Sequence, residues 1–142
     1  MCTFNRKLNY NKNAHTIKST QSYNFATRSL TELTLIHSKW YCFDFNLNKY
    51  LKIVPINIAD ILFARGLANW IMDDGYWKKT HNTVVLCTHS FKESEVDLLI
   101  AALNSNFGLI ASHNKQITKD KIYSLIVFSG KSNNINKLRD LV

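Results

Sequence analysis

Cysteine is scarce in this sequence, and the three cysteines that it contains are dispersed. Cys2, Cys42 and Cys87 form neither a Cys-x-x-Cys pair nor a Cys/His cluster with the spacing of zinc ligands. An odd number of distant cysteines argues against a disulfide framework, and the missing clusters argue against a structural zinc site. The pattern indicates a protein of a reducing compartment.

Long hydrophobic runs are absent as well. The most apolar stretch, residues 54–72, is interrupted by Asp60 and Arg65, whereas a membrane-spanning helix needs about 20 predominantly apolar residues. The opening residues 1–7 lack the apolar segment of a secretory signal. We therefore expect no membrane partner.

Acidic residues are outnumbered, with 10 Asp and Glu against 18 Lys and Arg, a net charge of +8 and a pI near 9.5. Such an excess is expected of a protein that meets phosphate backbones. It also occurs in soluble proteins without a binding patch, so charge alone leaves both interpretations open. A hydrophobic content of 46% is enough for one domain with a core.

Glycine and proline are rare, at four and one residues, whereas Asn, Lys and Ile are abundant. The three abundant residues have AT-rich codons, which are typical of organellar genomes. We expect a mitochondrial gene product, with the chloroplast as the alternative.

The second half of the chain carries clear periodic patterns. An apolar stripe at i, i+3, i+4, i+7 and i+11 starts at Val96 and predicts a helix. Ser90 and Glu93 have the spacing of a capping box before it, and Gly108 follows it where a helix C-terminal glycine belongs. β-branched and apolar runs predict strands at 83–87 and 123–128, with a weaker candidate at 109–113.

Upstream, the apolar segment 58–72 has a helical period, with Asn57 as a candidate N-cap. We expect Gly75 to end this helix in a left-handed conformation, which places Asp73 and Asp74 in its last turn. From Ser132 a further amphipathic helix begins, and we expect it to be cut short by the end of the chain.

A faint internal repeat links the two ends of the sequence. The segment 25–29 followed by 30–41 has the same form as 128–132 followed by 133–142. Each consists of an apolar strand end, a basic residue, a serine cap and an amphipathic helix.

Two adjacent carboxylates at a helix C-terminus stand against the negative end of the helix dipole, at a cost of about 0.3–1 kcal/mol each at exposed sites. Asp73 and Asp74 therefore have a chemical interpretation as ligands of Mg²⁺, a hard cation that prefers oxygen donors. The alternative is a solvated Asp-Gly turn.

The nine residues 67–75, Leu-Ala-Asn-Trp-Ile-Met-Asp-Asp-Gly, resemble the signature of LAGLIDADG homing endonucleases. The elements that follow, from 83–91 through 107–109 and 123–132, resemble the later elements of that family's repeat in the same order. The resemblance covers residues 58–142, and residues 25–58 resemble the last strand, the last helix and the linker of a preceding repeat.

This resemblance implies an α+β fold in which αββαββα repeats, each with a curved antiparallel sheet, pair through their signature helices. Residues 58–142 would be a second repeat with its last helix cut short, and residues 1–57 the tail of an incomplete first repeat. The family's function implies a Mg²⁺-dependent, site-specific endonuclease that hydrolyses phosphodiester bonds of double-stranded DNA.

The resemblance also implies roles for single residues. Asp74 stands where the family's metal-binding acid stands, and Asp73 where a backbone carbonyl contacts the metal. The family often has a Thr-Gln pair in the strand after the signature, where this sequence has Thr88 and His89. His89 can bind water, or it can be a solvent-facing residue at a strand end. Lys131 matches a basic residue near the active site, where it would stabilise the transition state or contact a phosphate.

Two surfaces follow from the same resemblance. The signature helix is expected to pair with another helix through a face with small residues, although the same stripe could pack inside its own domain: Ala64, Ala68, Ile71 and Met72. The sheet is expected to lie in the DNA major groove, with these contributors, although a solvated polar hairpin is the alternative: Tyr76, Trp77, Lys78, Lys79, Thr80, His113, Asn114, Lys115, Gln116, Lys119, Lys121 and, in the first repeat, Arg28.

A second acidic signature helix is not found before Asn24. We therefore expect a partner that supplies it, either a second copy of the chain or a complementary fragment. The alternatives are an intron maturase that binds intron RNA on the same fold, and a truncated, inactive DNA-binding remnant.

Overall fold

The computed structural model describes residues 2–11, 16–25, 30–118, 121–130 and 133–141. The chain forms two units, Met1–Leu35 and Ile36–Val142. In the first unit, strands β1 (Cys2–Asn11) and β2 (Thr16–Phe25) form an antiparallel hairpin that pairs Cys2 with Phe25. Helix α1 (Thr31–Trp40) follows and continues into the second unit.

The second unit begins with a short antiparallel hairpin of β3 (Tyr41–Asp44) and β4 (Lys49–Lys52). Its turn is held by Asp44, because Oδ1 accepts hydrogen bonds from the backbone N–H groups of Asn46 and Leu47 at 2.9 and 3.0 Å. Asn48 completes the turn at a φ of 48°, a left-handed conformation that asparagine tolerates. The sequence patterns did not predict this hairpin.

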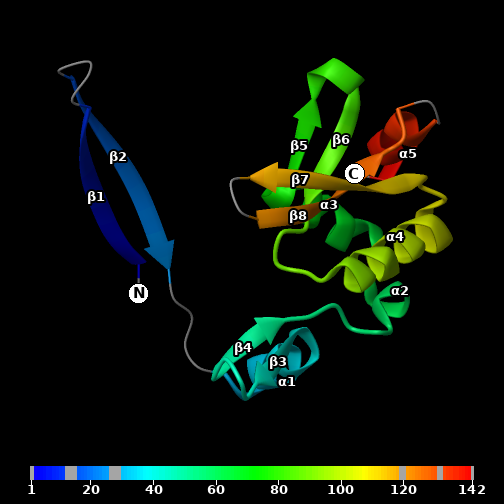
Figure 1. The fold of residues 1–142 in the computed structure, drawn as a ribbon, viewed down its shortest axis with the longest axis horizontal. Helices are drawn as coiled ribbons and strands as arrows, with labels where there is room; N and C mark the ends of the chain where they lie inside the picture. The colour runs from blue at the N-terminus through cyan, green and yellow to red at the C-terminus, as the bar shows by residue number, and fades with distance from the viewer. Residues whose placement is uncertain (1, 12–15, 26–29, 119–120, 131–132, 142) are drawn as a thin grey trace. The chain divides into compact units, whose positions relative to one another are not determined.

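A short helix, α2 (Ile58–Ile61), follows β4, and from α3 onward the second unit has the predicted order αββαββα (Figure 1). Its elements are α3 (Ala64–Asp74), β5 (Gly75–Lys78), β6 (Thr83–Cys87), α4 (Glu93–Phe107), β7 (Ala111–Thr118), β8 (Lys121–Phe128) and α5 (Asn134–Leu141). A short 3-10 helix, η1 (Lys79–His81), lies between β5 and β6. The α+β fold class expected from the resemblance is thereby confirmed.

The four strands form one antiparallel sheet in the order β5-β6-β8-β7. In Figure 1, β5 and β6 cross the direction of β7 and β8, so the sheet is strongly twisted. Leu86, Ile126 and Phe128 share one face by register and are fully buried. Helices α3, α4 and α5 pack on this face, which we call the helix face. Its opposite is the outer face.

Helix α4 confirms the predicted stripe, because Val96, Leu99 and Leu103 are buried in the core and Gly108 closes the helix at a φ of 60°. Its beginning was predicted wrongly. The helix starts at Glu93, and Glu95 accepts a hydrogen bond from the backbone N–H of Lys92 at 2.7 Å. The sequence contains two overlapping Ser/Lys-x-x-Glu spacings, and the later glutamate is the one that reaches the helix start.

The expected single helix over 58–72 is wrong. Helix α2 (Ile58–Ile61) ends at Leu62, whose backbone is extended, and α3 begins after Phe63, which is extended as well. Asn106 of α4 fills the break by donating through Nδ2 to the carbonyls of Ala59 and Leu62, at 2.6 and 3.1 Å. A side chain distant in sequence thus stabilises the break, which local periodicity cannot predict.

A strand followed by a helix occurs at both ends of the internal repeat, whereas its basic residues and serine caps lie outside the described residues and stay predictions. Strand β2 ends at Phe25 and α1 begins at Thr31, whereas β8 ends at Phe128 and α5 begins at Asn134. Among the described residues, no helix has the length and apolar character needed to cross a membrane.

Candidate functional site

The two carboxylates of the signature lie at the end of α3, as predicted. Asp73 and Asp74 are the last residues of the helix and both are exposed. Gly75 follows, and its N–H donates to the carbonyl of Ile71. The negative helix end and two carboxylates therefore stand together at the surface, an arrangement that favours a cation.

Gly75 is required for a different reason from the one predicted. Its φ is −91°, so the expected left-handed conformation is wrong. A Cβ at this position would overlap the carbonyl oxygen of Ile71 and would lie 3.0 Å from the Cα of Ile71. The chain turns directly from helix into strand β5, and only a residue without a side chain fits against the last helical turn.

Strand pairing places Asp74 beside β6. Gly75 pairs with Leu86, so the residue before it lies next to Cys87. Burial and, as a smaller cause, the Asp74 carboxylate raise the pKa of the Cys87 thiol. The thiol therefore stays protonated at neutral pH and is a neutral neighbour of the carboxylate. This proximity depends on strand register, so patterns in the sequence could not predict it.

A pocket of about 390 Å³ lies against the two carboxylates, and we call it the acidic pocket. Gly66 and Trp70 of α3 line it together with Asp73 and Asp74, and Lys52 and Phe91 line it as well. Its remaining lining is apolar, from Trp40, Ile58, Ile61, Leu62 and Leu99. Sequence reasoning missed Lys52, Trp70 and Phe91, because only the fold brings them together.

A second cavity of about 800 Å³ shares Lys52 and Phe91 with the acidic pocket. It lies between the β3–β4 hairpin and the segment 89–92, and we call it the hairpin groove. Aromatic and basic side chains line it, among them Tyr41, Phe43, Tyr50, Lys49 and Lys92.

Thr88 and His89, the two residues after β6, differ in burial and in their contacts. Thr88 is 1% exposed, and its hydroxyl donates to the carbonyl of Ser124 at 2.7 Å, so it fixes the end of β6 to β8. His89 is exposed, and its ring packs on Tyr123 with centroids 4.5 Å apart. His89 lines the hairpin groove and not the acidic pocket. Its role in catalysis stays a prediction.

Three basic candidates, Arg28, Lys119 and Lys131, lie outside the described residues. Lys121 begins β8, where it pairs with Thr118. Their roles also stay predictions.

The small-residue face predicted for helix pairing is only partly exposed. Ala64 and Ala68 are half-buried, Ile71 packs against the core, and Met72 is 73% exposed. Leu67 is the fully buried residue of α3. Gly66, by contrast, faces open space, since a Cβ there would meet only the Leu62 side chain, at 3.8 Å.

Alternation along the strands separates the predicted DNA contacts into two groups. Tyr76, Lys78, Asn114 and Gln116 share the outer face by register, whereas Trp77, His113 and Lys115 share the helix face. Lys79 and Thr80 are exposed in η1. A sequence without strand register could not separate these groups, because a one-residue shift exchanges the faces.

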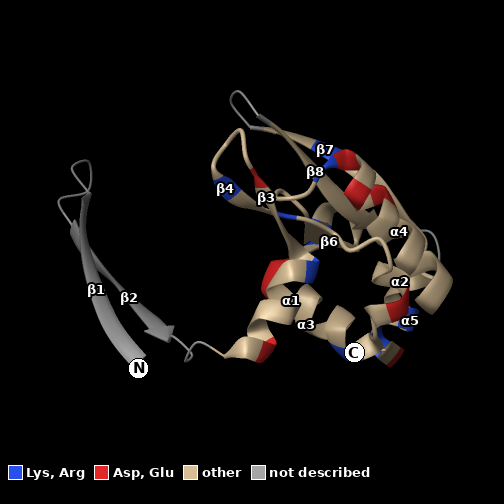
Figure 2. Ribbon diagram, turned by 90° about the horizontal axis from the view of Figure 1, so that it is seen from below, with Lys and Arg blue, Asp and Glu red and all other residues tan. Residues whose placement is uncertain are grey.

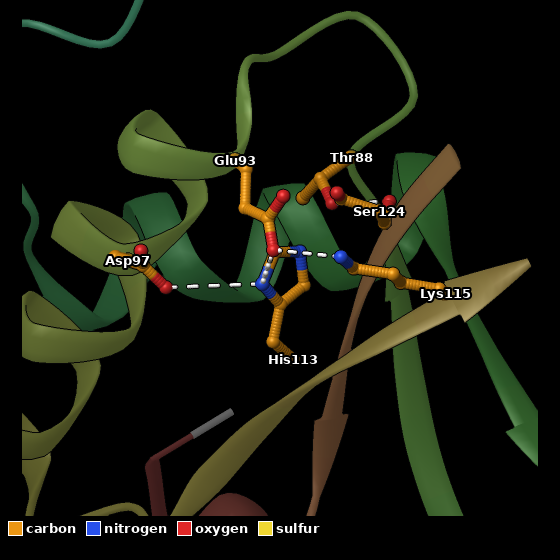
Figure 3. A network of polar contacts seen from close by, with 6 residues as sticks. All are labelled: Thr88, Glu93, Asp97, His113, Lys115 and Ser124. Carbon is orange, nitrogen blue, oxygen red and sulfur yellow. Dashed lines mark hydrogen bonds and ion pairs between the residues drawn. The ribbon is translucent and has the colours of Figure 1, made fainter. Parts of the chain in front are cut away.

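On the helix face, His113 and Lys115 contact acidic residues of α4 (Figure 3). His113 Nδ1 lies 3.7 Å from Glu93 Oε1 and 3.8 Å from Asp97 Oδ1. Lys115 Nζ lies 3.1 Å from Glu93 Oε1. The hydrogen bond and the charge of Lys115 lower the pKa of Glu93. Basic and acidic residues accordingly lie together at β7 and the start of α4 (Figure 2). This network ties the edge strand to the helix.

Two proteins are similar to this chain in sequence, and one solved structure is similar to it in fold. The chain is 41% identical over 88 residues to probable intron-encoded endonuclease 1 of Wickerhamomyces canadensis, which covers 58% of the chain and 37% of that protein. It is 28% identical to cytochrome b mRNA maturase bI2 of Saccharomyces cerevisiae, over 75% of the chain and 25% of that protein. The chain thus spans well under half the length of these relatives.

The fold is similar to that of the homing endonuclease I-WcaI bound to its DNA recognition sequence, with a TM-score of 0.64 and 24% identity. The similarity covers 99% of this chain and 58% of that chain. The sequence pattern of the LAGLIDADG DNA endonuclease family matches residues 1–136. Since this match spans both units, the chain belongs to the LAGLIDADG DNA endonuclease family.

Proposed function

We propose that this chain carries one half of the active site of a homing endonuclease that hydrolyses double-stranded DNA at a specific sequence. The observation that carries the proposal is the exposed Asp74 carboxylate at the end of α3, where the chain passes directly into the sheet. The names of an intron-encoded endonuclease and a homing endonuclease bound to DNA support the same reaction. The relative named a cytochrome b mRNA maturase supports a mitochondrial gene.

The donor chemistry of this site fits Mg²⁺ in part. Carboxylate oxygens are the ligands that Mg²⁺ prefers, and Asp74 offers one exposed carboxylate with the Asp73 carbonyl beside it. Among the described residues, no group of three or more His, Cys, Asp or Glu side chains could hold a metal ion. Phosphate oxygens and a second acidic residue would have to complete the set. A bound Mg²⁺ would lower the pKa of an attacking water and neutralise phosphate charge.

The chain's own residues supply positioning and charge. Gly75 lets the chain turn into β5 directly after Asp74, because a Cβ at this position would overlap the carbonyl oxygen of Ile71. His89 would orient water, and Lys131 would stabilise the negative charge of the pentacovalent phosphate.

DNA would bind on the outer face of the sheet. The face presents Tyr76, Lys78, Asn114 and Gln116, a set with a charged group for phosphates and amides for base edges. The major groove is wide enough for β-ribbons. His113 and Lys115 would support this surface from behind, through their contacts with α4.

The second acidic residue would come from a partner helix, which a second copy or a separate polypeptide could supply. The acidic pocket supports this proposal, since Gly66, Trp70 and Asp73 line an open, largely apolar surface next to the carboxylates. Gly66 permits close approach of a helix backbone. This face differs from the one through Ala64 and Ala68 that the sequence predicted.

Cleavage of DNA that carries the uninterrupted target gene tests the proposal. In Mg²⁺, the wild-type chain should cut the DNA, alone or with a polypeptide that carries the other signature helix. Asp74→Asn should abolish cutting, and the matched control Asp73→Asn should retain it, because Asp73 acts through its backbone. Cleavage by Asp74→Asn, or no cleavage by the wild type under either condition, would reject the proposal.

RNA binding as an intron maturase is the second candidate. It is supported by the relative named an mRNA maturase and by the aromatic and basic lining of the hairpin groove. Salt-sensitive RNA binding without DNA cleavage would favour this candidate over the nuclease.

A further inference from the structure

The hairpin groove is a cavity of about 800 Å³ whose lining includes neither Asp73 nor Asp74, although it shares Lys52 and Phe91 with the acidic pocket. Strands β3 and β4 form one wall and the segment 89–92 the other. The hairpin is joined to the body of the second unit, because the N–H of Val54 donates to Glu95 of α4 at 3.2 Å. Ligand sites of about 300–1,000 Å³ are common in proteins, so the cavity can hold a ligand of one or two nucleotides.

Aromatic rings on the hairpin are held in place by one another. His37 stacks on Tyr41 with centroids 4.6 Å apart and meets the edge of Tyr50 at 4.8 Å. Phe43 packs edge-to-face on Tyr50 at 5.0 Å. Despite these contacts, Tyr41 is 38% and Tyr50 57% exposed. Rigid rings with free surface are suited to stacking on a planar ligand.

The charge of the groove is positive. Its lining contains Lys49, Lys52 and Lys92 against one carboxylate, that of Asp44. Asp44 is engaged by its own turn through two backbone N–H groups. Within the described part of the chain, none of the three lysines forms an ion pair, and Lys52 Nζ lies 5.1 Å from the centre of the Phe91 ring. Lysines on both walls of an aromatic groove complement a phosphodiester backbone.

Exposed aromatic rings beside lysines favour a single-stranded nucleic acid over a duplex. Aromatic rings stack on base faces, and bases in a duplex already stack on one another. Asn46 and Ser90 also line the groove and can exchange hydrogen bonds with a ribose 2′-hydroxyl. We propose that the hairpin groove binds single-stranded RNA, with Tyr50 stacking on a base and Lys49 and Lys92 contacting phosphates. The inference rests on the RNA-binding candidate and not on DNA cleavage.

Fluorescence anisotropy with a labelled, unstructured RNA tests the inference on the complete chain. Tyr50→Ala should weaken RNA binding about tenfold, the effect of one lost base stack, whereas Tyr50→Phe should retain it. Lys49→Ala should lower the slope of log affinity against log salt by about 0.7, as for one phosphate contact on a single strand. Circular dichroism should show that each variant keeps the wild-type fold.

Tyr76 provides the matched control, since it is a tyrosine of similar exposure, 45% against 57%, on the outer face of the sheet. Tyr76→Ala should leave RNA affinity unchanged and weaken binding of duplex DNA, and Tyr50→Ala should do the reverse. A DNA single strand of the same sequence should bind more weakly than the RNA.

These measurements distinguish two failures: that the protein does not bind RNA, and that RNA binds outside the hairpin groove. If the wild type binds no RNA, both the RNA-binding candidate and the groove assignment are rejected. If RNA binds and both Tyr50→Ala and Lys49→Ala leave affinity and salt slope unchanged, only the groove is rejected. Equal or tighter binding of the DNA strand would overturn the assignment to RNA.

Discussion

Replacing Gly75 by alanine should destabilise the protein, although its backbone angles permit any residue. At a φ of −91° an alanine would ordinarily stabilise a protein, by about 0.4–1 kcal/mol, because it restricts the unfolded chain. Here the new Cβ would lie 3.0 and 3.1 Å from the Cα and carbonyl carbon of Ile71 and would overlap its oxygen. All three atoms belong to the backbone, so no side-chain rotation relieves the contact.

The size of this destabilisation follows from the displacement of the Ile71 backbone that the new Cβ requires. Overpacking of this kind costs about 1–3 kcal/mol. The shift also strains the hydrogen bond from Gly75 N–H to the Ile71 carbonyl, which contributes about 0.5–1.5 kcal/mol. We expect a loss of about 2–3 kcal/mol in the free energy of unfolding. Because Asp74 precedes the glycine, DNA cleavage should fall by more than the folded fraction does.

Gly66 of the same helix is the matched control. An added Cβ there would meet only the Leu62 side chain, at an ordinary 3.8 Å. Gly66→Ala should therefore raise the free energy of unfolding by about 0.5–1 kcal/mol, through helix propensity alone. Urea unfolding followed by circular dichroism measures both variants. Equal or greater stability of Gly75→Ala relative to the wild type would refute the steric argument.

Three further predictions concern side-chain contacts. Asn134→Ala should destabilise the protein by about 3 kcal/mol in thermal or urea unfolding, because the buried amide makes three hydrogen bonds to backbone groups; the exposed control Asn136→Ala should change stability by less than about 0.5 kcal/mol. Lys115→Met should return the depressed pKa of Glu93 toward its ordinary value in an NMR titration. Because that pKa is lowered in the folded state, the stability it contributes is present above about pH 4.3 and is lost as the pH falls through the folded value. Lys115→Met should weaken this dependence, since Lys115 is the largest cause of the shift. Lys78→Ala should reduce the salt slope of duplex DNA binding by about 1, and an unchanged slope would exclude a phosphate contact there.

Local patterns in the sequence were sufficient for the main elements. The stripe from Val96, the β-branched run 83–87 and the Asp-Asp-Gly end of the signature each occur in the structure where they were predicted. These signals depend on residues within a few positions of one another, so helix period, strand composition and terminal glycines determine them. The resemblance then ordered the elements into αββαββα.

The predictions from sequence were wrong or incomplete where a side chain or strand distant along the chain determines the local structure. Asn106 stabilises the break between α2 and α3, and the last turn of α3 makes Gly75 necessary without a left-handed angle. Register decided that Asn114 and Gln116 share the outer face while His113 and Lys115 turn toward α4.

The sequence by itself determined the family, the carboxylate that carries the proposed chemistry and most of the helices and strands. Only the tertiary structure placed Cys87 beside Asp74 and gathered Lys52, Trp70 and Phe91 around the acidic pocket. It also formed the hairpin groove from segments about 40 residues apart. The physical reason is that a pocket depends on which elements pack together, and packing joins residues whose separation along the chain carries no local pattern.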